Sequence, residues 1–193
     1  MKPTKKLPDD YLEIFTLNLS INRKALILIN GFALLLLMIF GLIFTDIFTT
    51  LRPKEFDQGN LWNSLKSLNT LLAIVLMLIL HEGTHAVFFW KFTGDKPKLG
   101  VTAFYAYAAA PKWFIPKPQY VIIGLAPLIL ITVIGIAIVP IISPELLPYH
   151  FFLLMMNATG SAGDIYVVAK VSRYPKDILV KDLGDAFQIY VNK

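Results

Sequence analysis

The chain has 193 residues, of which 56% are hydrophobic and 16% are charged. Because a soluble domain carries about 25% charged residues, this composition argues against a soluble protein and favours a membrane protein. The sequence contains no cysteine, which excludes disulfide bonds and thiolate metal ligands. The net charge of +5 comes from Lys and Arg residues spread between apolar segments. We therefore interpret these cations as topology signals and expect a lipid bilayer, and no nucleic acid, as partner.

Four apolar segments are long enough to cross a bilayer, which takes about 20 residues. The third contains Pro127, which should kink its helix because proline lacks a backbone donor. The fourth is the least apolar, since it contains the small and polar stretch NATGSAGD. The sequence therefore predicts an all-α membrane protein with about four transmembrane helices. These cover residues 25–48, 68–90, 119–142 and 149–171.

The cations alternate along the chain in a way that predicts the orientation of the helices. Residues 1–24, residues 91–118 and the segment from Lys170 onward each contain five Lys or Arg residues, whereas residues 49–67 contain three and residues 143–148 contain none. By the positive-inside rule, both termini and the 91–118 loop should be cytoplasmic. We expect a cytoplasmic segment, a four-span membrane domain that carries the site, and a cytoplasmic tail. Their boundaries are residues 1–24, 25–171 and 172–193.

The 99–110 segment, LGVTAFYAYAAA, is bounded by glycine and proline and is not a predicted span. Within it, Val101, Ala103, Tyr105 and Tyr107 alternate with Thr102, Phe104 and Ala106. This alternation predicts a short strand or hairpin at the cytoplasmic edge of the membrane. Such a strand is either a place where an extended substrate pairs or a surface hairpin without that role.

The second predicted span carries the motif HEGTH in apolar surroundings, where ionisable side chains are expensive and indicate function. His81 and His85 are four residues apart, so both imidazoles leave the same helix face and can occupy two corners of a zinc tetrahedron. Glu82 points to the side of the metal, where it can take a proton from water and pass it to a leaving amine. The alternative interpretation is a structural polar cluster.

A catalytic zinc needs a third protein ligand at the same depth. His150 and Asp46 are predicted near the outer face, and we interpret His150 as an interfacial residue. Asp164 lies six residues before Lys170, just as His85 lies six residues before Lys91. At 1.5 Å per residue, both lie about 9 Å below the cytoplasmic edge, which favours Asp164 as the third ligand.

Asn157 lies two predicted helical turns before Asp164, on the same face of the helix. The stretch between them consists largely of small residues, which permit close helix packing in lipid. This closeness would let the carboxylate reach a metal held by the neighbouring helix, unless the stretch is only a packing seam. Asn157 either assists catalysis, by donating to the oxyanion or orienting the substrate, or simply packs.

HEGTH, the strand-like segment, the proline-bearing span and NATGSAGD together resemble a family of small bacterial membrane proteins called putative zincin peptidases. That family is in turn similar to the site-2 intramembrane zinc metalloproteases. The resemblance covers about residues 70–190 and implies one zinc ion on His81, His85 and Asp164, with Glu82 as base and Asn157 assisting. The sequence departs from the site-2 pattern because Asp164 follows Gly163 and precedes Ile165, without a Leu-Asp-Gly run.

The leading hypothesis is a membrane-embedded zinc endopeptidase that cleaves a peptide or membrane-protein substrate near the cytoplasmic side. A second hypothesis is a non-catalytic zinc-stabilised scaffold or partner-binding subunit. Glu82 discriminates between these two, because a structural zinc site needs no base and is usually closed by four protein ligands. A transporter is disfavoured, since the sequence shows no second set of intramembrane carboxylates and no paired broken helices.

Overall fold

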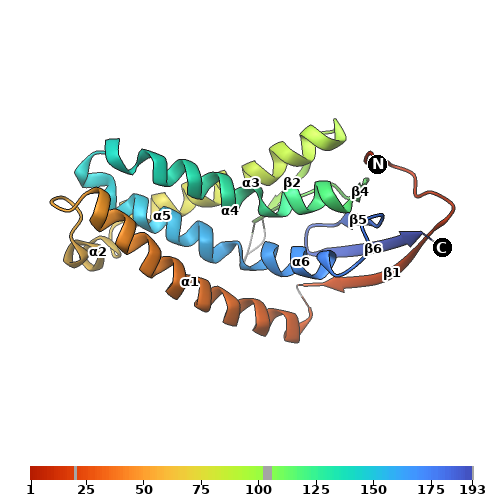
Figure 1. The fold of residues 1–193 in the computed structure, drawn as a ribbon, viewed down its shortest axis with the longest axis horizontal. Coiled ribbons are helices and arrows are strands. Elements are labelled where there is room, and N and C mark those ends of the chain that lie inside the picture. The colour runs from red at the N-terminus through yellow and green to blue at the C-terminus, as the bar shows by residue number, and fades with distance from the viewer. Residues whose placement is uncertain (20, 102–105, 193) are drawn as a thin grey trace. The chain divides into compact units, whose positions relative to one another are not determined.

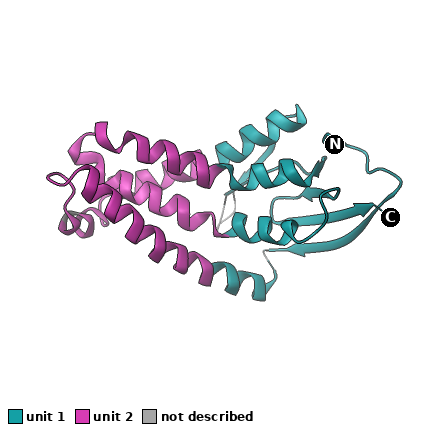
Figure 2. Ribbon diagram, viewed as in Figure 1, with its two compact units in different colours: residues 1–30, 82–126, 163–193 teal, residues 31–81, 127–162 magenta. Residues whose placement is uncertain are grey.

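The computed structural model of the protein describes residues 1–19, 21–101 and 106–192. It contains two compact units, which Figure 2 distinguishes by colour. Each unit is built from segments that are distant in the chain, and three long helices contribute to both. Unit 1 comprises residues 1–30, 82–126 and 163–193, and unit 2 comprises residues 31–81 and 127–162.

Unit 1 contains a four-stranded sheet with the strand order β1-β6-β5-β4, in which all neighbours are antiparallel. Figure 1 shows β1 and β6, from opposite ends of the chain, lying side by side. The expectation of an all-α fold is therefore wrong. The strands are β1 (Tyr11–Asn18), β4 (Phe114–Pro116), β5 (Leu179–Asp182) and β6 (Ala186–Asn192).

Hydropathy did not predict the sheet, because β1, β5 and β6 lie outside the long apolar segments. A signal for β6 was nevertheless present in the alternation of its side chains. Phe187 and Ile189 are buried on one face of the strand, whereas Gln188 between them is partly exposed. The alternation in the sequence is a strand signal, although Ala186 and Tyr190 on the other face are buried as well.

A separate two-stranded sheet lies within the segment predicted to form a strand or hairpin. β2 (Lys98–Val101) pairs antiparallel with β3 (Ala106–Ala109), and Lys98 lies opposite Ala109. The hairpin is thus present, although residues 102–105 of the predicted alternation lie outside the described residues. Tyr107 packs so closely over Gly100 that an added Cβ there would lie 2.3 Å from its ring.

Within the described residues, four helical segments are long and apolar enough to cross a membrane, which confirms the number expected from hydropathy. These segments are Arg23–Leu51, Leu68–Thr93, Lys117–Ile141 and Pro144–Ser172. The third consists of α4 (Lys117–Ile138) and a short 3-10 turn, η1 (Val139–Ile141), and Pro127 lies inside α4. The first and second are α1 (Arg23–Leu51) and α3 (Leu68–Thr93), and α2 (Gln58–Ser64) lies between them, N-capped by Asp57.

The fourth apolar segment differs from the single predicted helix because it is divided. It begins with η2 (Pro144–Leu146) and continues as α5 (Leu147–Gly160) and α6 (Ala162–Ser172), with a turn at Ser161. The Ser161 hydroxyl donates a hydrogen bond to the Asn157 carbonyl, which satisfies a carbonyl at the end of α5. Because of this division, Asp164 lies in the first turn of α6 instead of mid-helix.

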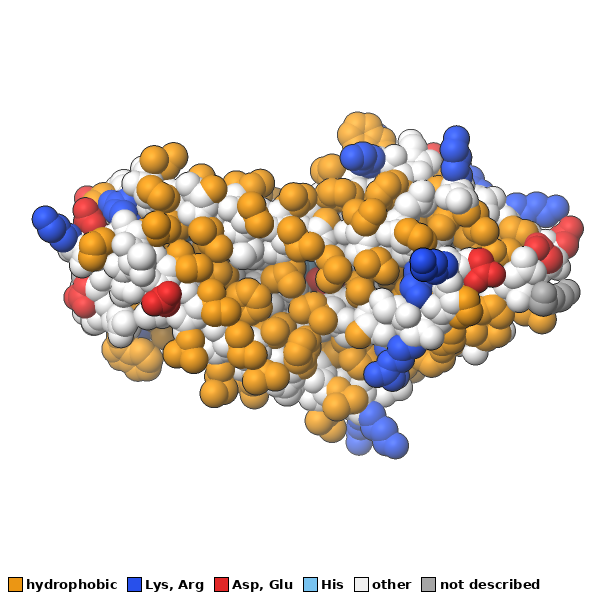
Figure 3. Space-filling view, in the orientation of Figure 1, with side chains coloured by type: hydrophobic (Ala, Val, Ile, Leu, Met, Phe, Trp, Pro, Cys, Tyr) orange, Lys and Arg blue, Asp and Glu red, His pale blue; other side chains and the backbone are white. Residues whose placement is uncertain are grey.

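The apolar surface of these helices is largely uncovered by protein. In the most apolar stretch of α1, only 6% of the residues are buried, and large side chains such as Ile27, Met38 and Leu42 are more than half exposed. Figure 3 shows apolar side chains over much of the face drawn. Contiguous apolar surface of this extent indicates contact with lipid or another protein.

Each unit has its own hydrophobic core. The core of unit 1 joins helices to the sheet, with Phe89 of α3, Ile123 of α4 and Val171 of α6 packed with Val180 and Ile189 of the strands. The core of unit 2 is aromatic, with Phe44 and Phe48 of α1 fully buried in the same cluster as Phe151 of α5. Packing on the sheet of unit 1 therefore positions the C-terminal half of α3, the start of α4 and α6, which carry the site.

Candidate metal centre

The HEGTH motif lies inside α3, which runs without interruption because its sequence from Leu68 to Thr93 has no proline and is rich in Leu. The boundary between the two units falls between His81 and Glu82. Since the helix is continuous there, the four-residue spacing places both imidazoles on one helix face. Both histidines are buried, at 6% and 7% exposure, so each needs a polar partner.

Asn157 of α5 orients the His81 ring. Its Oδ1 lies 3.1 Å from His81 Nδ1, while its Nδ2 donates to the Pro127 carbonyl at 3.3 Å. A carbonyl only accepts, so the amide nitrogen faces Pro127 and the amide oxygen faces the imidazole. His81 must then donate from Nδ1, which leaves the lone pair of the neutral ring on Nε2. Asn157 is fully buried, as a group with this role should be.

The backbone carbonyl of Ile123 in α4 orients the His85 ring. It lies 2.9 Å from His85 Nδ1, so this nitrogen also donates, and Nε2 is the nitrogen that faces Asp164 and can bind a metal. In a regular helix that carbonyl would accept from the backbone N–H of residue 127, four positions later. Residue 127 is proline and has no N–H. The proline inside α4 thus leaves the Ile123 carbonyl available to the histidine.

Asp164 meets His85 at a separation that suits a shared metal ion. Its Oδ1 lies 3.4 Å from His85 Nε2, and its side chain is one quarter exposed. Two ligands at about 2.1 Å from a tetrahedral zinc ion stand about 3.4 Å apart. Asp164 also lies in the first turn of α6, where the backbone dipoles favour a negative charge.

The close approach of α4 and α6 depends on Gly124. A Cβ added there would lie 2.6 Å from Cγ2 of Val168, so a larger residue would push the two helices apart. Of the small residues in NATGSAGD, Ala158 and Ala162 are buried, whereas a Cβ at Gly160 or Gly163 would meet no described heavy atom within 4 Å. Gly124 on α4 is thus a further small residue on which this packing depends.

The three expected ligands come together as one cluster. A nitrogen of His81, a nitrogen of His85 and a carboxylate oxygen of Asp164 lie within 4.8 Å of one another. A set of two nitrogens and one carboxylate oxygen is used by catalytic zinc and by non-haem iron. Because the two imidazoles are oriented by hydrogen bonds at Nδ1, their Nε2 atoms are the ones suited to bind an ion.

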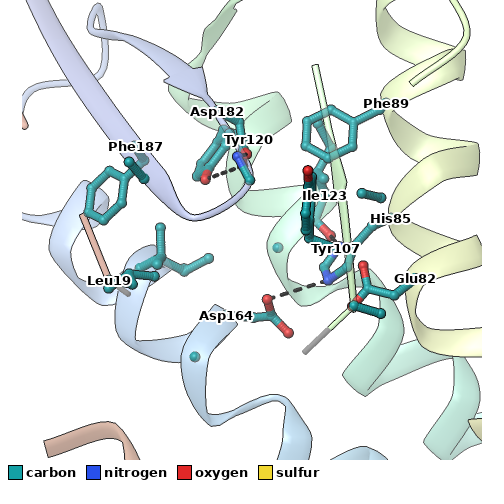
Figure 4. A pocket seen from close by; sticks show the side chains of 18 residues that line it. Leu19, Glu82, His85, Phe89, Tyr107, Tyr120, Ile123, Asp164, Asp182 and Phe187 are labelled. Atoms are coloured by element: carbon teal, nitrogen blue, oxygen red, sulfur yellow. Dashed lines mark hydrogen bonds and ion pairs between the residues drawn. The ribbon is translucent and has the colours of Figure 1, made fainter. Parts of the chain in front are cut away.

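A cavity of about 160 Å³ adjoins these ligands within unit 1. Glu82, His85 and Asp164 line it, together with apolar side chains from α3, α4, α6 and the sheet. Figure 4 shows Glu82 beside His85, with Asp164 facing His85 from the other side. The proton-transfer candidate and two of the expected ligands thus share one cavity.

The cavity also contains a polar pair that sequence reasoning missed. Tyr120 of α4 donates a hydrogen bond to Asp182 Oδ2 at 2.8 Å, and the Gly184 N–H donates to Asp182 Oδ1 at 2.9 Å. Burial raises the pKa of Asp182, and the hydrogen bond from Tyr120 opposes this. The sequence offered only a weak signal, because Asp182 lies in the predicted cytoplasmic tail, where charged residues are common.

The remaining histidine is packed inside unit 2. His150 is buried, and its Nε2 lies 2.9 Å from the Gly135 carbonyl. Its ring centroid is 6.0 Å from that of Phe48. His150 is therefore a packed, hydrogen-bonded residue of unit 2, and it does not belong to the His81, His85 and Asp164 cluster.

Comparison with known proteins identifies the family. Residues 74–179 match the family described as "putative zincin peptidase". The chain belongs to this family. The matched range contains both histidines, Glu82, Asn157 and Asp164, and the description indicates a zinc-dependent peptidase. Of the two metals that the ligand set fits, the family therefore favours zinc.

A relative from Pyrococcus woesei, named "Uncharacterized 24.7 kDa protein in gap 5'region", is 34% identical over 119 residues. The match covers 58% of this chain and 50% of the relative, so the chain spans about half the length of that protein. No solved structure matches this member of the zincin peptidase family.

Proposed function

We propose that this protein is a membrane-embedded zinc metalloendopeptidase of the HExxH type, which hydrolyses peptide bonds of membrane-associated substrates near the cytoplasmic side. The observation that carries the proposal is the cluster of His81, His85 and Asp164 with Glu82 in the adjoining cavity. Membership of the zincin peptidase family supports the same chemistry.

In this proposal, Nε2 of His81, Nε2 of His85 and a carboxylate oxygen of Asp164 hold one zinc ion. Zinc bound there supplies a Lewis acid that polarises the scissile carbonyl and acidifies water. Asn157 and the Ile123 carbonyl keep the two imidazoles in the required orientation through their Nδ1 atoms. Three protein ligands leave a coordination position open, as catalysis requires.

Glu82 supplies proton transfer in this reaction. Its carboxylate accepts a proton from the attacking water, whose oxygen forms a bond to the carbonyl carbon of the substrate. The same carboxyl group then donates that proton to the leaving nitrogen as the C–N bond breaks. Glu82 lines the cavity beside His85, which is the position that this role demands.

The membrane location rests on the exposed apolar helices and on the distribution of charge. All Lys and Arg residues except Arg52, Lys54 and Lys66 belong to unit 1. A concentration of cations beside apolar helices is typical of the cytoplasmic side of a membrane protein. We therefore propose cytoplasmic termini and a substrate that reaches the site from the cytoplasmic half of the bilayer.

Glu82→Gln tests the catalytic proposal, because glutamine keeps the shape of glutamate but cannot accept the proton. We expect the purified variant to retain zinc while its cleavage of a panel of single-span membrane proteins falls about 10²- to 10⁴-fold. Glu55→Gln, at an exposed position in unit 2, is the matched control. Cleavage by Glu82→Gln at the wild-type rate would contradict the proposal and favour a zinc-stabilised scaffold.

A further inference from the structure

Asp182 is the feature of the cavity that the proposed reaction does not use. It lines the same cavity as Glu82, His85 and Asp164. In Figure 4, Asp182 and Tyr120 lie at one end of the drawn cavity, and Asp164 lies at the other. The cavity therefore extends from the proposed metal centre to a second carboxylate.

Among the described residues, no cationic side chain donates a hydrogen bond to Asp182. Asp182 accepts hydrogen bonds from two neutral donors, the Tyr120 hydroxyl and the Gly184 N–H. Among the residues that the structure describes, no ion pair joins Asp182 to a Lys, Arg or His side chain. A carboxylate has about four lone-pair sites, so two acceptor sites remain for a ligand.

Apolar side chains form the walls between the two carboxylates. They include Ile123 of α4, Val167 of α6, Phe187 of β6 and Leu19 of the turn after β1. A cavity of about 160 Å³ is comparable to the ~150 Å³ apolar cavity that binds benzene. It therefore has room for one side chain of moderate size with an apolar stem.

We propose that this cavity is a specificity subsite for a cationic nitrogen of the substrate, which pairs with Asp182 while the peptide bond lies at Glu82 and the metal ligands. This inference rests on the proposed peptidase function and names the substrate class that the site selects. A Lys or Arg side chain has the required form, since its methylene stem packs on apolar walls and its charge lies at the tip. The α-amino group of a substrate is the other source of such a nitrogen.

The burial of Asp182 supports a cation over other ligands. A buried carboxylate without a cation is unfavourable, and burial accordingly raises its pKa. A bound ammonium or guanidinium group would offset that cost by a charge-assisted hydrogen bond. An acidic substrate group beside Asp182 would be repelled by its carboxylate.

The proposed location agrees with this chemistry. Membrane proteins carry Lys and Arg next to the cytoplasmic ends of their helices. A peptidase that acts near that level would meet such residues beside the scissile bond. Selection of a cation by Asp182 would then direct cleavage to the junction between an apolar span and its basic flank.

The test captures peptides on zinc-loaded full-length protein carrying Glu82→Gln, which binds substrate without cleaving it. The probe is a library of short randomised peptides with neutral flanks, one half acetylated at the N-terminus and the other half free. We compare Glu82→Gln alone with Glu82→Gln combined with Asp182→Asn, or with Asp185→Asn as a control in the same turn. Bound peptides are sequenced by mass spectrometry, and wild-type protein is separately tested for cleavage of the same library.

We expect Glu82→Gln to enrich Lys and Arg at one position at least about tenfold, and Asp182→Asn to remove that enrichment. Asp185→Asn should retain it. Enrichment that requires only the free N-terminus would assign the cation to the α-amine. Three results would each overturn the subsite. They are capture without enrichment of Lys or Arg, enrichment that persists in the variant with Asp182→Asn, and the absence of any capture. Absence of wild-type cleavage, with cation capture intact, would instead overturn the peptidase function alone.

Discussion

At the scale of single residues, the hydrogen bond between Asn157 and His81 separates two roles for the asparagine. Both polar ends of its side chain are engaged, one by His81 and the other by the Pro127 carbonyl. An amide with this arrangement positions a ligand more readily than it donates to an oxyanion. We therefore propose that Asn157 acts through His81, as partners of zinc-binding histidines commonly do.

Asn157→Ala tests this role. We expect zinc affinity to fall about 10- to 100-fold, because the His81 ring loses the acceptor that holds its orientation. The measurement is zinc binding to the purified protein by competition with a chelator, with Asn30→Ala as a control at an exposed position. Normal zinc affinity with lost cleavage would instead place Asn157 at the reacting carbonyl.

The raised pKa of Asp182 predicts a pH dependence of stability. A carboxyl group whose folded pKa lies above its unfolded value favours the fold below the unfolded pKa, and this contribution disappears as pH rises through the folded pKa. Asp182→Asn removes the titration and should therefore stabilise the protein relative to wild type more at pH 7 than at pH 4. Thermal unfolding in detergent measures this difference, and a constant difference across that range would contradict the assignment.

At the scale of elements, Pro127 connects the geometry of α4 to the metal centre. The proline leaves the Ile123 carbonyl without its usual helical donor. His85 Nδ1 instead donates a hydrogen bond to this carbonyl at 2.9 Å. Proline in a helix interior usually costs ~3 kcal/mol. The presence of Pro127 is explained if the Ile123 carbonyl, which lacks a helical donor, is needed to orient the proposed zinc ligand His85.

Pro127→Ala should therefore separate stability from function. The alanine N–H would compete with His85 for the Ile123 carbonyl, so we expect an unchanged or higher thermal midpoint and a zinc affinity lower by about 10- to 100-fold. Pro118→Ala is the matched control, because Pro118 lies in the first turn of the same helix, where an N–H has no intrahelical partner. Full zinc affinity in Pro127→Ala would contradict this account.

At the scale of the whole molecule, charge predicts which ends of the helices face the cytoplasm. Lys98 is an exposed residue of unit 1, the unit that contains most cations, whereas Glu145 belongs to unit 2. The absence of cysteine makes single-cysteine variants simple to interpret. We expect a membrane-impermeant thiol reagent applied to intact cells to label Glu145→Cys and to spare Lys98→Cys. The reverse pattern would invert the orientation and place the proposed site on the outer side.

Local signals in the sequence predicted the helical segments and all three proposed metal ligands. Apolar runs of about 20 residues define the four helices, because length and hydropathy are properties of each segment alone. The four-residue spacing of His81 and His85 was likewise sufficient to place them on one face of α3. Asp164 could be selected because its distance from Lys170 along the chain matched the distance of His85 from Lys91.

Contacts between segments decided the rest. The strands β1 and β6 pair across almost the entire chain, and such a pairing has no local signature. Nothing near His85 in the sequence indicates that a carbonyl exposed by Pro127 would accept its proton, and nothing near Glu82 indicates that Asp182 shares its cavity. The sequence by itself determined the apolar helices and which side chains are candidates for metal binding and proton transfer, whereas the tertiary structure decided their hydrogen bonds and neighbours, because both depend on residues that only folding brings together.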